Sequence, residues 1–147
     1  MKTLTGTLLA LGLMSSASVA GTDFGSKQDA MELTDKIISI IDADGLSAGI
    51  EALFDPEQPF ATSRMGVNVF AGTVVVGDNR EPEMVAADYA TTPDLTGALV
   101  WPLIDAAADD GADVVLKWYH YDTQEVYDYH CFSQHAANPN YTVMVCR

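Results

Sequence analysis

Residues 125–146 read EVYDYHCFSQHAANPNYTVMVC and decide the fold of the C-terminal part of the chain. Two runs rich in aromatic and β-branched residues, Glu125–Gln134 and Tyr141–Cys146, flank a short segment that contains Asn and Pro. Such runs favour strands, and Asn and Pro favour turns. The sequence therefore predicts an antiparallel hairpin whose centre lies near Asn138.

The two cysteines of the chain both lie in this hairpin. A turn centred near Asn138 places Cys131 opposite Cys146, and in an oxidising compartment such a pair predicts a disulfide. Closing a loop of about 15 residues stabilises a fold by about 3 kcal/mol in the chain-entropy model. A reactive or metal-binding thiol pair is the alternative, which export of the chain disfavours.

Residues 1–20 have the order of a secretory signal peptide. They carry the basic Lys2, then the apolar run Leu8–Met14, and end in small residues at Ala20. The apolar run is too short to span a bilayer of about 30 Å. We therefore expect cleavage near Ala20 and a single periplasmic or secreted domain, residues 21–147, with no membrane insertion.

Residues 27–44 carry apolar side chains at helical spacing, after Ser26 and Asp29, which form a capping-box pattern. The sequence predicts a long amphipathic helix that ends before Gly45, followed by a short helix over residues 47–54. The segment from Asp42 to Gly45 resembles the start of a calcium loop, but the remaining ligand positions are missing, which favours a helix end.

The middle of the chain alternates between strand and helix signals. The sequence predicts strands over residues 67–70 and 73–76 in a tight hairpin, short helices over 82–88 and 102–110, and a strand over 114–121. Short turns between consecutive strands require antiparallel pairing. The expected fold class is α+β and PAS-like: a five-stranded antiparallel sheet with the long N-terminal helix on one face and the short helices on the other.

The charge of the chain excludes several partners. It has 147 residues, with 21 acidic and 7 basic side chains, for a net charge of −14 that becomes −15 when Lys2 is cleaved off. Nucleic acids and anionic membranes both attract clustered Lys and Arg, so neither is an expected partner.

Four segments then point to a known family. Residues 54–60 (FDPEQPF), 67–77, 102–111 and 114–118 resemble, in order and spacing, the single Cache domains of exported bacterial sensory proteins. The sequence departs from the family's pattern after the second strand, where no His occurs, and at Leu116, where a Tyr is usual. The resemblance implies a PAS-like sensory domain with a small-ligand pocket under the middle helices.

The candidate binding residues lie mostly near the C-terminus, where aromatic side chains are concentrated. Strand alternation places Trp118 and His120 on one face and Tyr119 and Tyr121 on the other. The aromatic and basic candidates are Arg64, Lys117, Trp118, Tyr119, Tyr121, Tyr127, Tyr129 and His130. Arg64 and Lys117 would supply the counter-charge for a carboxylate, with salt bridges on the surface as the alternative for each.

No pattern for catalysis, metal binding or a cofactor is present. Ser133 lacks a nucleophile-elbow motif, and His120, His130 and Asp128 lack diagnostic metal-ligand spacing. The acidic pair Glu81 and Glu83 is assigned to a solvated helix end. We therefore expect neither an enzyme nor a bound metal or cofactor.

The sequence thus favours a small-molecule-binding sensory domain that acts as a stand-alone periplasmic protein. The expected ligand is a small organic acid or amino acid, and a separate membrane-bound sensor or receptor would receive the signal. The alternative is a ligand-free structural or protein-interaction domain of the same fold.

Overall fold

The computed structural model describes residues 24–147, so the expected signal peptide lies outside the described residues. Its centre is a sheet of five strands. These are β1 (Gly66–Ala71), β2 (Val74–Asp78), β3 (Asp113–Tyr119), β4 (Val126–His135) and β5 (Tyr141–Cys146). All neighbouring pairs are antiparallel, in the order β2-β1-β5-β4-β3, which confirms the expected sheet.

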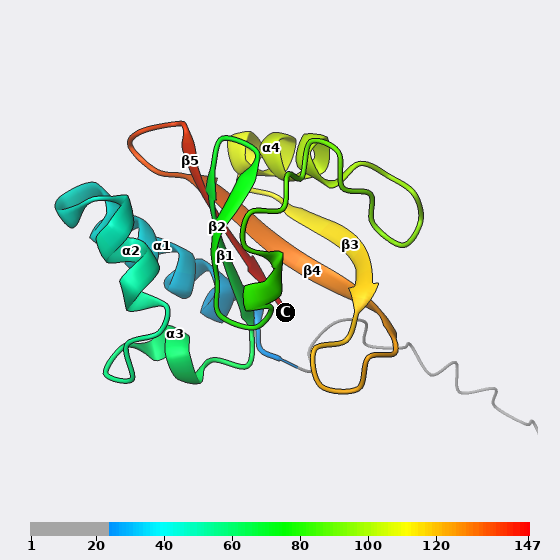
Figure 1. Ribbon diagram of the computed structural model, residues 1–147, viewed down its shortest axis with the longest axis horizontal. Helices are drawn as coiled ribbons and strands as arrows, with labels where there is room; N and C mark the ends of the chain where they lie inside the picture. Colours follow the sequence, from blue (N-terminus) through cyan, green and yellow to red (C-terminus); the bar gives the residue numbers. More distant parts are fainter. Residues whose placement is uncertain (1–23) are drawn as a thin grey trace, which may run out of the picture.

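Helices cover both faces of this sheet (Figure 1). They are α1 (Lys27–Asp44), α2 (Leu46–Ala52), α3 (Pro59–Thr62), the 3-10 turn η1 (Pro82–Met84) and α4 (Val100–Asp110). The long α1 contacts β4 and β5, with α2 against it, whereas α4 contacts β3 and β4. The expected α+β arrangement is confirmed, and none of the described helices is long and apolar enough to cross a membrane.

The long helix forms for the local reasons that its sequence indicates. The Ser26 hydroxyl accepts a hydrogen bond from the Asp29 N–H, and the Asp29 carboxylate accepts one from the Ser26 N–H, which completes the capping box. Its apolar face is buried along Ala30, Leu33 and Ile37. The helix ends at Asp44 as expected, because Gly45 follows with φ of 93°.

The expected helix over residues 82–88 is wrong. Only η1 is helical there, and the chain then extends along β2. The Ala86 N–H donates to the Val75 carbonyl, and the Val75 N–H donates to the Ala87 carbonyl. Pairing with the exposed edge of β2 satisfies these backbone groups, which a helix would have bonded internally.

The disulfide hairpin is confirmed. Cys131 and Cys146 are direct partners in the β4–β5 register and are joined by a disulfide with a sequence separation of 15. The strand before this hairpin, β3, ends at Tyr119, two residues earlier than expected. The chain turns after it, and the His120 N–H donates to the Glu125 carbonyl at 2.7 Å.

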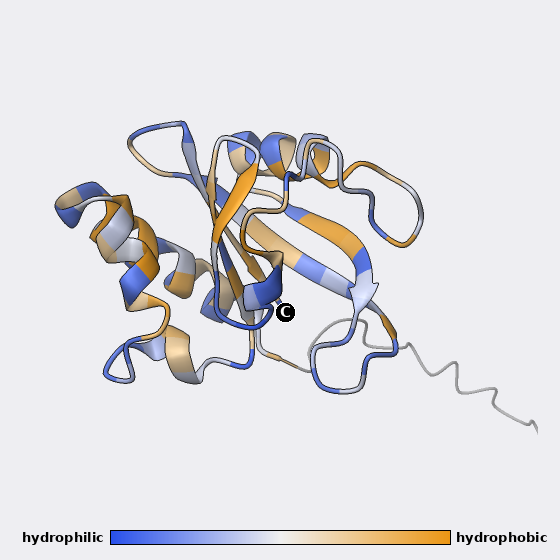
Figure 2. Ribbon diagram, in the orientation of Figure 1, coloured by the Kyte–Doolittle hydropathy of each residue, from blue (hydrophilic) through white to orange (hydrophobic). Residues whose placement is uncertain are grey.

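The central strands are buried on both faces. In β1 and β5 every residue except one terminal residue of each is buried. Figure 2 shows hydrophobic stretches along the strands between the two helical layers. Two-sided cover gives continuous apolar runs rather than alternation.

Candidate functional site

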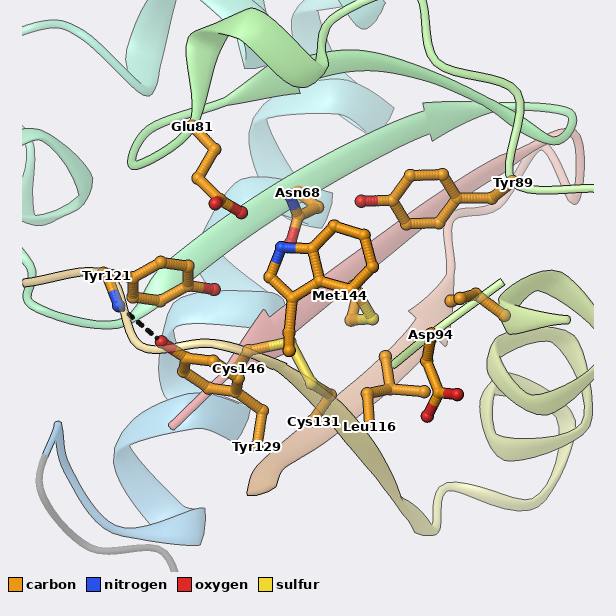
Figure 3. A pocket seen from close by; sticks show the side chains of 12 residues that line it. Asn68, Glu81, Tyr89, Asp94, Leu116, Tyr121, Tyr129, Cys131, Met144 and Cys146 are labelled. Atoms are coloured by element: carbon orange, nitrogen blue, oxygen red, sulfur yellow. Dashed lines mark hydrogen bonds between the residues drawn. A yellow bond between two sulfur atoms is a disulfide. The ribbon is translucent and has the colours of Figure 1, made fainter. Parts of the chain in front are cut away.

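A small cavity lies on the sheet face opposite α1, beneath the segment that connects β2 to α4 (Figure 3). Its volume is about 30 Å³. It is lined by aromatic rings, two carboxylates, apolar side chains and the disulfide. The lining residues are Asn68, Glu81, Tyr89, Asp94, Val100, Leu116, Trp118, Tyr121, Tyr129, Cys131, Met144 and Cys146.

Four strands, β1, β3, β4 and β5, build the floor of the cavity. Side chains of a strand alternate between faces, so Leu116 and Trp118 of β3 share a face with Tyr129 and Cys131 of β4. The disulfide to Cys146 continues this floor into β5 (Figure 3). The alternate residues of these strands face α1. One of them is Phe132, whose ring lies 5.9 Å from the ammonium of Lys27.

Asp78, at the end of β2, fixes the turn that brings Glu81 to the cavity. Its side chain is buried and accepts hydrogen bonds from the Arg80 and Glu81 N–H groups, both at 2.8 Å. The Asn68 amide donates to its other oxygen at 2.5 Å. Burial raises the pKa of Asp78 above its ordinary value, although these hydrogen bonds oppose the rise.

Glu81 is a half-buried carboxylate that points toward the middle of the cavity (Figure 3). Burial raises its pKa from 4.5 to about 7, and the nearby charges of Asp78 and Glu83 act in the same direction. A hydrogen bond from the Trp118 side chain and the positive charge of Arg80 oppose this rise. Glu81 is therefore a carboxylate whose charge is only partly compensated.

Asp94 is held by its own loop. One carboxylate oxygen accepts from the Thr96 N–H at 2.8 Å, the Thr96 hydroxyl at 2.5 Å and the Ala98 N–H at 3.2 Å. The other oxygen accepts from the Lys117 N–H at 3.2 Å. Desolvation opposes ionisation, but these hydrogen bonds outweigh it and lower the pKa of Asp94. Asp94 thus anchors the loop against β3.

Three tyrosines bring phenol groups to the cavity. The Tyr129 hydroxyl accepts from the Tyr121 N–H at 2.9 Å, and the two rings lie 4.6 Å apart. Tyr89 packs edge-on against Phe70 at 5.2 Å. Burial raises the pKa of Tyr89, Tyr121 and Tyr129, so all three phenols stay neutral at physiological pH.

Gly66 makes room for the Tyr121 side chain. A Cβ atom added at Gly66 would overlap the Tyr121 hydroxyl. Tyr121 follows the end of β3, so strand alternation does not apply to it, and its ring lies on the same side as Trp118 and Tyr129. The expectation that it shares a face with Tyr119 is therefore wrong.

Three of the eight candidate residues, Trp118, Tyr121 and Tyr129, line the cavity. Tyr127 lies beside it, with its ring 4.7 Å from that of Tyr129. The remaining aromatic candidates lie elsewhere. Tyr119 is 44% exposed, and His130 pairs through its backbone with Arg147.

Arg64 and Lys117 are not among the residues that line the cavity. The Arg64 guanidinium contacts the Asp122 carboxylate at 3.3 Å and lies 5.3 Å from the Phe24 ring. The Lys117 ammonium contacts the Asp128 carboxylate at 2.5 Å. Both residues therefore form the surface ion pairs that were the alternative to ligand binding.

The sequence reasoning missed the polar residues that β1 and the β2–α4 segment contribute, namely Asn68, Glu81, Tyr89 and Asp94. Glu81 in particular is half-buried at the cavity rather than part of a solvated helix end. A signal was present in the polar run Asp78–Glu81, which begins at the last residue of β2.

The histidines and cysteines do not form a metal site within residues 24–147. No group of three or more His, Cys, Asp or Glu side chains there could hold a metal ion. Both cysteines are in the disulfide, and the His120 ring accepts hydrogen bonds from the backbone of Asp122 and Thr123 at 3.2 Å.

Comparison with known proteins identifies the fold. No protein-family model and no curated protein matches the chain. A methyl-accepting chemotaxis protein from Vibrio parahaemolyticus RIMD 2210633 has a similar structure, with a TM-score of 0.65 and 14% identity over 82% of this chain and 86% of that one.

Two further solved structures are similar over 82% of this chain. One is a Cache chemosensory domain described for its recognition of carboxylic acids (TM-score 0.63, 12% identity, 90% of that chain). The other is a periplasmic sensor domain of a chemotaxis protein (TM-score 0.59, 16% identity, 88% of that chain). The chain therefore has the fold of a Cache domain, as the sequence resemblance predicted.

Proposed function

We propose that this domain binds a small molecule in the cavity between the floor strands β1, β3, β4 and β5 and the β2–α4 segment, as the sensory part of an exported system. The observation that carries the proposal is the cavity itself, whose lining combines two carboxylates and three phenols with Trp118 and apolar side chains. Such a combination of apolar surface and few polar groups is typical of ligand sites. The shared fold with chemotaxis sensor domains supports it.

Export and signalling form the second part of the proposal. Residues 1–20 have the pattern of a signal peptide, which would bring the domain to the periplasm or the medium. Ligand binding would then be passed to a separate membrane-bound sensor or receptor.

The ligand expected from the sequence was an organic acid or an amino acid. Arg64 and Lys117, which motivated a carboxylate, are engaged by Asp122 and Asp128 away from the cavity. An organic acid would therefore need a different counter-charge from the two considered. An amino acid keeps one group that suits the cavity, its ammonium.

One observation favours the alternative of a ligand-free domain that acts through its surface. The cavity of about 30 Å³ is far smaller than the roughly 300–1,000 Å³ of common ligand pockets. A domain that needs no ligand would have such a well-filled interior.

A thermal-shift screen of amines, amino acids and organic acids separates the two functions. A ligand present at 100 times its dissociation constant adds about 2.7 kcal/mol of stability. A clear rise of the melting temperature with any compound supports the binding function. A flat response to the whole panel would contradict it and favour the ligand-free alternative.

A further inference from the structure

The cavity is acidic. Two of its lining side chains are the carboxylates of Glu81 and Asp94, and none of the described residues that line it is Lys, Arg or His. Asp94 already accepts hydrogen bonds on both oxygens from its loop and from β3. Glu81 is therefore the carboxylate available to a ligand.

Arg80, the neighbour of Glu81 in sequence, makes its contacts outside the cavity. The Arg80 guanidinium contacts the Asp122 carboxylate at 2.6 Å and donates to the Arg64 carbonyl at 2.5 Å. It also lies 5.0 Å from the centre of the Tyr121 ring. Arg80 is thus committed to the β3–β4 turn and is not among the residues that line the cavity.

The walls around Glu81 suit a cation. Trp118, Tyr121, Tyr129 and Tyr89 line the cavity with aromatic rings. Ring faces attract ammonium groups, most strongly where water is excluded. A half-buried carboxylate beside them gains a counter-ion and hydrogen-bond donors when an ammonium enters, whereas a carboxylate ligand would meet like charge.

We propose that the cavity binds a small protonated amine, whose ammonium N–H groups donate to the Glu81 carboxylate and whose alkyl part lies against Trp118 and Tyr129. This assignment rests on the proposed binding function and narrows its ligand. A volume of about 30 Å³ holds about two water molecules, so the amine has only a few non-hydrogen atoms. Primary and secondary amines fit, since a quaternary ammonium has no N–H to donate.

Isothermal titration calorimetry at pH 8 tests the ligand class on the purified protein. The probes are methylammonium, ethylammonium and ethanolammonium chloride, compared with sodium acetate, sodium propionate and tetramethylammonium chloride, with potassium chloride as the ionic-strength control. We expect binding of at least one of the primary amines and none of the other salts. Binding of the carboxylates without the amines would overturn the amine assignment while leaving the binding function standing.

The role of Glu81 is tested with Glu81→Gln against Glu83→Gln. The control removes the same charge from an exposed residue two positions away that does not line the cavity. Loss of a charged hydrogen bond predicts about 10- to 100-fold weaker amine binding in Glu81→Gln and unchanged binding in Glu83→Gln. Equal affinities in the two variants would refute the contact.

The pH dependence of the wild type gives a readout that needs no variant. The charged groups that act on Glu81 are Asp78, Glu83 and Arg80, and Trp118 donates a hydrogen bond to it. With its pKa at about 7, amine affinity should fall about tenfold from pH 8 to pH 6, while an alkylamine with a pKa near that of Lys, about 10.4, stays protonated. An amine affinity that stays constant or rises toward low pH would contradict a contact between the ammonium and the ionised Glu81. Absence of binding by every compound would contradict the amine proposal and the binding function together.

Discussion

The charge of Glu81 should destabilise the folded protein at alkaline pH, and Glu81→Gln should remove this effect. The carboxyl group has its pKa raised from 4.5 to about 7 by burial and by Asp78. Folding therefore favours its protonated form. The free energy of unfolding should be unaffected by Glu81 well below pH 4.5, fall as pH rises from 4.5 to 7, and carry the full penalty above pH 7.

The size of the effect follows from that pKa difference. At 1.36 kcal/mol per pH unit, the interval from 4.5 to about 7 corresponds to at most about 3.4 kcal/mol. Glu81 is only half-buried, and solvent screening reduces this value, so we expect about 1.5 kcal/mol. For a domain of this size, Glu81→Gln should therefore raise the melting temperature at alkaline pH by about 5 °C.

Thermal unfolding followed by circular dichroism at pH 5 and pH 8.5 measures this effect. The wild type and Glu81→Gln should melt at similar temperatures at pH 5 and differ by about 5 °C at pH 8.5. Glu83→Gln, at an exposed neighbouring position, is the matched control; its charge contributes only a minor part of the raised pKa of Glu81, so its pH dependence should change much less than that of Glu81→Gln. If the Glu81→Gln difference is the same at pH 5 and pH 8.5, the buried-charge argument is refuted.

Three further substitutions test the packing and the local structure. Replacing both Cys131 and Cys146 by Ala should lower the free energy of unfolding by about 3 kcal/mol, because the disulfide closes a 15-residue loop. Urea unfolding measures this loss, and a loss below about 1 kcal/mol would contradict the expected value. Gly66→Ala should lower the free energy of unfolding by about 1–3 kcal/mol and displace Tyr121 from the cavity, so amine affinity should also fall. If stability and amine binding both stay unchanged, the close contact between Gly66 and Tyr121 is refuted. Ser26→Ala should lower the free energy of unfolding by about 1 kcal/mol, because the capping box of α1 is lost; thermal unfolding measures this. Ser39→Ala, which changes an exposed serine inside α1, is the control and should have a smaller effect.

Much of the fold follows from local sequence signals. Ser26, the apolar spacing after it and Gly45 give the beginning, face and end of α1. The Asn- and Pro-containing turn before Tyr141 gives the register that joins Cys131 to Cys146. These features depend on residues close together in the chain, so the sequence alone suffices to predict them.

The prediction of a helix over residues 82–88 was wrong because partners far away in the chain decide the structure of this segment. Its residues have no strong local preference, and the exposed edge of β2 offers them backbone partners. Long-range hydrogen bonding decides such a segment, and no pattern within it reveals the partner.

The site depends on tertiary structure in the same way. The sequence named Trp118 and Tyr129 as candidate aromatic residues, but only the pairing of β3 with β4 shows that they share one face of the sheet. It left Arg64 between a ligand and a surface ion pair, and folding brings Asp122, 58 residues away, to its guanidinium. It assigned Glu81 to solvent, although the Asp78 turn carries that carboxylate over the sheet.

The sequence by itself determined the class of the fold, the long helix, the hairpin and the disulfide, because each depends on spacing, capping or turn residues that are adjacent in the chain. Only the tertiary structure decided the sign of the charge at the cavity. That sign depends on which ionic side chains find partners from distant segments and which carboxylate is left half-buried without a full counter-charge.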